Sequence, residues 1–307
     1  MLKNIVEDTK RILMLEEKGI SAEVQDALSL LLTALKENMA TYGRSSQNQT
    51  VYWQNFDIDL FGGFKITVEC FINIFTQNSG QIPEKEFKYN TQDKVISINY
   101  KTVLPKFNPN NINFDECPGF VSGLSHELKH AYQHLKIQRN RNDDKSDLLN
   151  YKEQNVYNMA LDVQNMNHKK GTLDKYVASL IYYTNPSEIT AFQEVLYTEG
   201  KTVEYNQISH YIYESSMAKI YKKIDMMLTT VLNSGCNEDS NLNKHLQYVY
   251  NRNVIWFVKR LKKGLQRYDK ALKDTEKLLK KRLTSTVNEN YTPDYWNEIM
   301  ESLKLIL

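Results

Sequence analysis

Cysteine is scarce in this chain of 307 residues, which contains only Cys70, Cys117 and Cys236. An odd, widely spaced set excludes a disulfide framework or a cysteine-rich zinc cluster, and it favours a reducing compartment. Glycine (11) and proline (6) are also few, as is usual in a mostly helical chain. No apolar run approaches the roughly 20 residues that span a bilayer. The formal charge of +2 gives no general attraction to nucleic acid or membrane.

The rest of the composition is that of a globular protein, with 25% charged and 41% hydrophobic residues. Glu7 and Asp8 stand too close to the first residue for a secretory signal. We therefore expect a cytoplasmic protein without a membrane segment. The sequence carries no indication of its oligomeric state.

Hydrophobic periodicity predicts an α+β fold that is mostly α-helical. Apolar residues alternate with polar ones from Phe64 to Ile74 and from Ile96 to Leu104, which is typical of half-buried strands. We expect a small antiparallel sheet, with a hairpin turn near residues 90–93. Helical spacing predicts helices at about 2–18, 21–41, 118–138, 151–167, 173–183, 186–200, 202–232 and 243–283, and a short one after Pro293. These elements suggest an N-terminal helical segment (1–45), a core (46–200) and a helical C-terminal region (201–307).

The most informative motif lies in the predicted helix 118–138 and reads His126-Glu127-Leu128-Lys129-His130. Residues i and i+4 share one face of a helix, so His126 and His130 can bind a single metal ion. Glu127 lies beside them, where it can take a proton from water. The motif therefore predicts two zinc ligands and a general base.

A catalytic zinc site usually has a third protein ligand. The strongest candidate is Glu188, in the first turn of a helix that Asn185 caps and Pro186 begins. Glu194, six residues later and on a different face, is the alternative carboxylate. His168, in a polar helix end, is a further alternative.

Two other routes to a third ligand are excluded. His134 continues the four-residue spacing, but it is eight residues from His126, a rise of about 12 Å along the helix axis. Zinc–nitrogen bonds are about 2 Å, so one ion cannot bind both residues. The extended motif with glycine and histidine after the second ligand fails, because Gln133 and Lys136 occupy those positions.

The order of strands, His-Glu-x-x-His helix and glutamate helix over residues 60–200 resembles the gluzincins, a family of zinc metallopeptidases. The likeness is greatest to the compact members from phages and mobile elements and to repressor-cleaving immunity proteases. It implies Zn²⁺ bound by His126, His130 and Glu188, with Glu127 as the general base. It also implies a polypeptide substrate that pairs with an edge strand near residues 95–104.

Two departures from the family concern residues around the predicted ligands. Larger gluzincins have an aspartate four residues after the ligand glutamate, where it orients the first histidine. Here that position is Phe192. The family also uses a hydrogen-bond donor for the oxyanion. Tyr182, Tyr183 and Tyr197 are candidates by proximity in the sequence.

Two other functions remain open. The chain can be a non-catalytic structural or binding protein that keeps a zincin-like fold. Eleven Lys and Arg residues between Lys259 and Arg282, with interleaved aromatic residues, also fit contact with nucleic acid. A solvated helix face explains this segment better, because Leu261, Leu265, Leu272 and Leu279 follow helical spacing.

Overall fold

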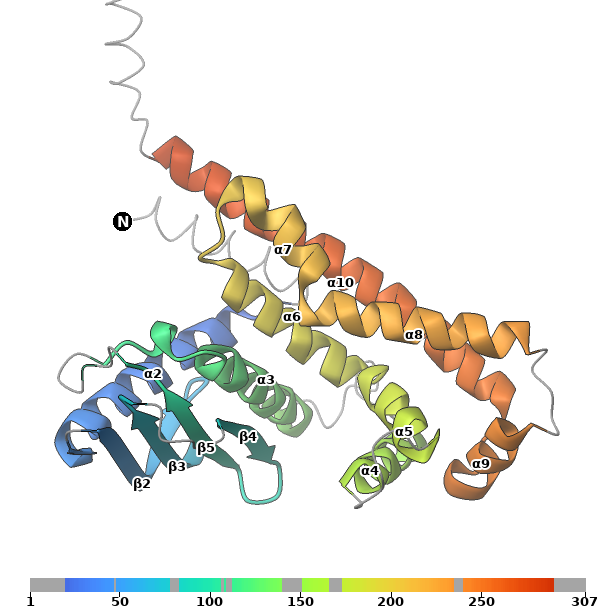
Figure 1. The fold of residues 1–307 in the computed structure, drawn as a ribbon, viewed down its shortest axis with the longest axis horizontal. Helices are drawn as coiled ribbons and strands as arrows, with labels where there is room; N and C mark the ends of the chain where they lie inside the picture. Colours follow the sequence, from blue (N-terminus) through green and yellow to red (C-terminus); the bar gives the residue numbers. More distant parts are fainter. Residues whose placement is uncertain are drawn as a thin grey trace, which may run out of the picture.

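The computed structural model describes residues 20–46, 48–77, 83–105, 108, 112–139, 151–165, 173–234 and 240–289. A small sheet with two helices forms one end of the molecule, and the remaining helices extend away from it (Figure 1). The predicted α+β, mostly helical fold is confirmed. The helices predicted at 2–18 and after Pro293, as well as His168 and Cys236, lie outside the described residues.

The sheet has five strands in the order β1-β2-β3-β5-β4. Their bounds are β1 Arg44–Ser45, β2 Gln49–Leu60, β3 Phe64–Phe75, β4 Glu84–Asn90 and β5 Val95–Val103.

The prediction of an antiparallel sheet is wrong in one respect, because β3 and β5 pair in parallel. Strand β4, the next strand along the chain after β3, lies at the edge of the sheet and does not pair with β3. The chain then returns through a hairpin as β5 between β3 and β4. The strand near residues 95–104 is therefore internal, and the expectation that it is an edge strand is wrong as well. The edge on this side of the sheet is β4.

Strand β2 was not predicted, because its polar composition hides its alternation. Gln54, Asn55, Asp57 and Asp59 are exposed along it. It pairs with β3 over its whole length, from Gln49↔Phe75 to Leu60↔Phe64. Phe61, Gly62 and Gly63 connect the two strands with φ values of 50°, 73° and 99°, a left-handed turn that glycine adopts without strain.

The helices follow the predicted order, with two breaks that the periodicity did not reveal. The helix predicted at 202–232 divides where Ser215 caps a new helix, and the helix predicted at 243–283 divides at Asn251, which has a left-handed backbone. None of the described helices combines the length and apolarity that crossing a membrane requires. Their bounds are α2 Ala22–Tyr42, α3 Phe120–Arg139, α4 Tyr151–Asn165, α5 Leu173–Tyr183, α6 Pro186–Gly200, α7 Ile208–Glu214, α8 Ser216–Asn233, α9 Asn241–Tyr250 and α10 Val254–Glu289, with short 3-10 turns at Phe114–Glu116 and Tyr205–Gln207.

Buried apolar side chains form two separate clusters. The first joins α2, α3 and the inner face of the sheet, and we call these elements the sheet region. The second joins α4 to α10, and we call these elements the helical region. Helix α6 supplies Ile189, Leu196 and Tyr197 to the second cluster, yet it packs along α3 of the sheet region (Figure 1). The contact between α3 and α6 is where the two regions meet.

The long helix α10 supports the turn between α5 and α6. Arg260 donates hydrogen bonds to the carbonyl oxygen of Ile181 (3.0 Å) and to the hydroxyl of Thr184 (2.8 Å). Tyr268 donates its hydroxyl proton to the carbonyl oxygen of Tyr183 (2.9 Å). These bonds satisfy carbonyl groups that the end of α5 leaves without helical partners. They hold the chain in place just before α6 begins.

Candidate metal centre

Helix α3 places His126 and His130 on one face, as their spacing predicts. Their Nε2 atoms are 3.1 Å apart, and both rings are mostly buried. The helix can lie this close to strand β4 because Gly123 has no side chain. A Cβ atom at Gly123 would come within 2.4 Å of the Phe87 ring.

Helix α6 supplies Glu188 from its first turn. The Asn185 side chain accepts a hydrogen bond from the backbone N–H of Ser187 (3.1 Å), and Pro186 begins the helix. Both features agree with the prediction from the sequence. Ala191, one turn later, is fully buried and lets α6 approach α3.

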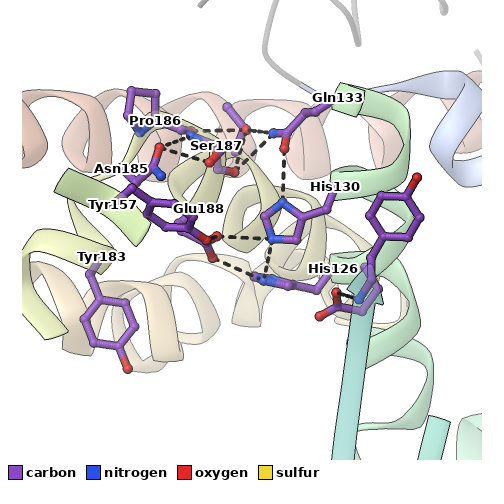
Figure 2. A network of polar contacts seen from close by, with 12 residues as sticks. His126, His130, Gln133, Tyr157, Tyr183, Asn185, Pro186, Ser187 and Glu188 are labelled. Atoms are coloured by element: carbon purple, nitrogen blue, oxygen red, sulfur yellow. Dashed lines mark hydrogen bonds and ion pairs between the residues drawn. The ribbon is translucent and has the colours of Figure 1, made fainter. Parts of the chain in front are cut away.

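The Glu188 carboxylate points at the two imidazoles (Figure 2). Its Oε2 atom is 3.4 Å from His126 Nε2, and its Oε1 atom is 3.3 Å from His130 Nε2. The side chain is 1% exposed, so this carboxylate is almost completely removed from water. The structure thus brings together the three residues predicted as ligands, one of them from the helical region.

The three separations fit a zinc ion. A tetrahedron with bonds of about 2.0–2.1 Å has edges of about 3.3–3.4 Å. The two Nε2 atoms are 3.1 Å apart, and each lies at a similar distance from one oxygen of Glu188, His126 at 3.4 Å from Oε2 and His130 at 3.3 Å from Oε1. Glu188 Oε2 is also buried without a hydrogen-bond donor, a costly state for a carboxylate oxygen that a cation would relieve. Two imidazole nitrogens and one carboxylate are a usual donor set for zinc.

The charges at the centre favour a cation between the ligands. Burial alone would raise the pKa of Glu188, but His130 and His126 outweigh it and hold that pKa well below its ordinary value. Burial lowers the pKa of His130, and the charge of Glu188 more than compensates, raising it to about 9. Without a metal, the carboxylate therefore holds a proton on His130. A metal ion competes with that proton for the same place.

Gln133 orients His130, a role that the sequence reasoning missed. Its Oε1 atom is 3.1 Å from His130 Nδ1, and its Nε2 donates to the Thr190 hydroxyl (2.7 Å) and to the carbonyl oxygen of Ser187 (3.2 Å). Because an amide oxygen only accepts, Nδ1 carries the proton and Nε2 presents its lone pair to a metal. The position of Gln133, three residues after His130, places it on the same helix face and is the signal that could have revealed it.

Glu127 lies next to the ligands and contacts the edge strand. The backbone N–H of Tyr89 in β4 donates to Glu127 Oε2 at 2.7 Å. Burial raises the pKa of Glu127, against the opposing charges of His130 and His126 and the Tyr89 hydrogen bond. Strand β4 thus holds the Glu127 carboxylate beside the three proposed ligands. The sequence analysis did not predict this contact.

Two tyrosines contact the Glu188 carboxylate. Tyr157 of α4 donates its hydroxyl proton to Glu188 Oε1 at 2.9 Å. Its ring stacks on that of Tyr182, with centroids 5.8 Å apart. Burial, together with the charge and hydrogen bonding of Glu188, raises the pKa of both tyrosines. Tyr182 was among the candidates for the oxyanion, whereas Tyr157 was missed because it is 31 residues from Glu188 in the sequence.

No protein-family model, curated protein or solved structure matches this chain. What the centre can do chemically must therefore be read from its own residues.

The other residues considered as ligands are placed elsewhere or are engaged otherwise. His134 contacts the Tyr89 hydroxyl through Nδ1 (2.8 Å) and Gln138 through Nε2 (2.9 Å). Glu194 is fully buried and lies 3.1 Å from Lys129 Nζ. His168 lies outside the described residues.

The remaining aromatic residues from the sequence have other surroundings. The Phe192 ring packs edge to face on His126 at 5.0 Å, where a gluzincin would have its orienting aspartate. Tyr183 forms ring contacts with Tyr182 and Phe192. Tyr197 is buried in the helical region, 5.2 Å from Lys201 Nζ.

The basic segment Lys259–Arg282 lies on α10. Leu261 and Leu279 are buried against the helical region, and Leu265 and Leu272 pack on its core as partly buried side chains. Nine basic residues of this segment are exposed: Lys259, Lys262, Lys263, Arg267, Lys270, Lys273, Lys277, Lys281 and Arg282. This is the arrangement of an amphipathic helix whose apolar stripe is covered.

Proposed function

We propose that the protein is a zinc-dependent peptidase with a gluzincin-like ligand set. The observation that carries the proposal is the convergence of His126, His130 and Glu188 beside the carboxylate of Glu127. Among the described residues, the group that could hold a metal ion consists of three side chains, those of His126, His130 and Glu188. Three protein ligands leave a coordination position for water or substrate, as catalytic zinc sites do, whereas structural zinc sites are closed by four.

In the proposed reaction each of the chain's own groups has a defined task. A bound zinc ion supplies Lewis acidity, which polarises a carbonyl group and makes water acidic near neutral pH. Glu127 accepts a proton from the attacking water and passes it to the leaving amine. Its raised pKa suits this task, because a carboxylate with a higher pKa is a stronger proton acceptor. The Tyr89 N–H keeps the carboxylate in position.

Tyr157 and Tyr182 act as neutral hydrogen-bond donors. Because the pKa of each hydroxyl is raised, both tyrosines are neutral at physiological pH and can donate hydrogen bonds. We assign to the pair the task of orienting the Glu188 carboxylate, as groups that hydrogen-bond to a metal ligand do.

We further propose that the substrate is a polypeptide and that the protein acts in a reducing compartment such as the cytoplasm. The free thiols of Cys70 and Cys117, both buried in the sheet region, support the second statement. The raised pKa of each thiol, caused mainly by burial, makes both unreactive.

The test compares the purified protein with its Glu127→Gln variant. Both are stripped with a chelator, reloaded with zinc and analysed for metal content, and hydrolysis of an unfolded polypeptide is then followed. We expect equal zinc content, and a rate about 10²–10⁴-fold lower in the variant, the usual contribution of a general base. Equal rates in the two proteins would remove Glu127 from the mechanism.

A non-catalytic role is the second candidate, and one observation favours it. The ligands come from both regions, so a metal ion would cross-link two separate cores and stabilise the fold without any reaction. Stoichiometric zinc with no cleavage of any unfolded substrate would select this role over catalysis.

A further inference from the structure

A buried ion pair joins α3 to α6 beside the proposed metal centre. Lys129 Nζ is 3.1 Å from Glu194 Oε2, and the two side chains are 8% and 0% exposed. Lys129 directly precedes the ligand His130 on α3, and Glu194 follows the ligand Glu188 by six residues on α6. Each partner of the pair thus shares a rigid helix with a proposed ligand.

The carboxylate of Glu194 also receives hydrogen bonds from the start of α2. The backbone N–H of Ser21 donates to Oε2 at 3.1 Å, and the Gln25 amide donates to Oε1. Gln25 also donates to the Thr198 hydroxyl at 3.1 Å, and that hydroxyl is 3.1 Å from the hydroxyl of Ser125. Three helices from both regions therefore meet in one buried polar network.

Stability alone does not explain why this ion pair is buried. Removing two charges from water costs several kcal/mol per ion, and apolar residues of similar size often stabilise a fold as well or better. Polar contacts, however, tolerate little displacement. Sliding or rotating α6 by one residue turns its side chains by about 100° and separates Lys129 from Glu194, whereas apolar packing can readjust. The pair therefore selects one register of α6 on α3.

We propose that Lys129 and Glu194 are positioning residues for the metal centre. By fixing the register of α6 on α3, they hold Glu188 at ligand distance from His126 and His130. The inference rests on the proposed metal centre and adds residues that contact neither metal nor substrate. It also gives the motif's fourth position, Lys129, a task of its own.

The experiment uses cobalt(II) in the full chain, because its visible spectrum reports coordination geometry. The variant is Lys129→Met combined with Glu194→Gln, which removes both charges but keeps an acceptor oxygen for Ser21. We expect cobalt affinity to fall about 10–100-fold, the usual effect of losing a group that orients a metal ligand. We also expect the cobalt spectrum to change.

The matched control is Asn243→Ala in the helical region. Asn243 is 2% exposed, and its side chain accepts a hydrogen bond from the backbone N–H of Val254 at 2.9 Å. Its loss lowers stability far from the centre, so its cobalt affinity and spectrum should equal those of the unmodified protein. Should the double variant not fold, Lys129→Met alone is the second variant, because Glu194 keeps its hydrogen bonds from Ser21 and Gln25, and the same changes are expected.

The outcomes separate the two proposals. If the unmodified protein binds no cobalt or zinc, the metal centre is absent and both proposals fall. If it binds cobalt and the folded charge-removal variant keeps the same affinity and spectrum, only the positioning role is overturned. Lys129→Arg preserves the charge, so its cobalt affinity should lie between that of the double variant and that of the unmodified protein. An affinity as low as that of the double variant would also contradict the role of the ion pair.

Discussion

The sheet region and the helical region contribute to the proposed metal centre in different ways. The sheet region supplies His126 and His130 from adjacent turns of one helix, so their proximity is a local property of α3. The helical region supplies Glu188, 58 residues after His130, and its position depends on how α6 packs on α3. One part of the centre forms with a single helix, and the other forms only when the two cores are joined.

Because of this difference, substitutions in the two regions should affect different parts of the centre. Changes within the sheet region should alter the histidine pair or the base, whereas changes within the helical region should alter the delivery of the carboxylate. A metal ion bound by ligands from both regions would resist separation of the sheet region from the helical region.

The largest effect is expected when either region loses its ligand. Zinc at a hundredfold excess over its Kd should stabilise the unmodified protein by about 2.7 kcal/mol, by mass action. His130→Ala and Glu188→Ala should each abolish that increment and reduce bound zinc to near zero. Thermal unfolding with and without a chelator, together with metal analysis, measures both quantities. If Glu188→Ala retained full zinc affinity, the centre would belong to the sheet region alone.

Two glycines offer a matched pair of overpacking substitutions, one in each region. A Cβ atom would meet the Phe87 ring at 2.4 Å in Gly123→Ala and the Thr184 side chain at 2.6 Å in Gly264→Ala. Each should lower the free energy of unfolding by about 1–3 kcal/mol.

Their effects on the centre should differ. Gly123→Ala displaces β4, whose Tyr89 N–H holds Glu127, so turnover should fall while zinc stays bound. Gly264→Ala displaces Thr184 just before the cap of α6, so zinc affinity should fall. Urea unfolding, zinc competition and kcat distinguish the two. A fall in zinc affinity in both variants, or in neither, would contradict this division between the two regions.

Gln133→Met tests the contact that crosses between the regions. It removes the acceptor for His130 Nδ1 and the donor to Thr190 and Ser187 of α6. Zinc affinity should fall about 10–100-fold, measured by competition with a chromophoric chelator. The control is Gln138→Met. Gln138 is on the same helix and contacts His134, which is not a proposed ligand, so zinc affinity should be unchanged.

The smallest effect concerns acid and the sheet region alone. Burial of the ring, followed by the charge of Lys94, lowers the pKa of His134 below its usual value of about 6.5. The folded protein then takes up this proton less readily than the unfolded chain. The stability linked to His134 is therefore fully present above about pH 6.5 and is lost as the pH falls below it.

His134→Gln should reduce that acid sensitivity. Measured in chelator, the drop in Tm between about pH 7.5 and about pH 5.5 should be smaller in the variant than in the unmodified protein. The chelator keeps metal loss from contributing to the comparison. An equal drop would mean that His134 does not titrate differently in the folded state.

Local patterns predicted most of the elements and the three residues that the structure brings together as candidate ligands. The four-residue spacing of His126 and His130, and the Asn185-Pro186 start of the helix that carries Glu188, are signals contained within a few residues. Alternation in β3 and β5 was also sufficient to predict strands.

Long-range contacts were beyond these patterns. Nothing in the alternation of β5 distinguishes an internal strand from an edge strand, so the parallel pairing with β3 was not predicted. The polar composition of β2 concealed a strand that is visible only with its partner beside it. Tyr157 and Glu194 are likewise defined by what other helices bring next to them.

The hydrogen bonds from α10 to the α5–α6 turn bear on how small a working version of this protein can be. All the proposed ligands and the base lie before residue 200, so a fragment ending there would carry every reacting group. It would lack Arg260 and Tyr268, which hold the turn in front of α6, and it would leave the apolar side of α6 without its cover. Such a fragment would contain the reagents without the framework that brings them together. For engineering, the C-terminal helices are therefore not a removable appendage, and a smaller catalyst would need a new support in place of α10.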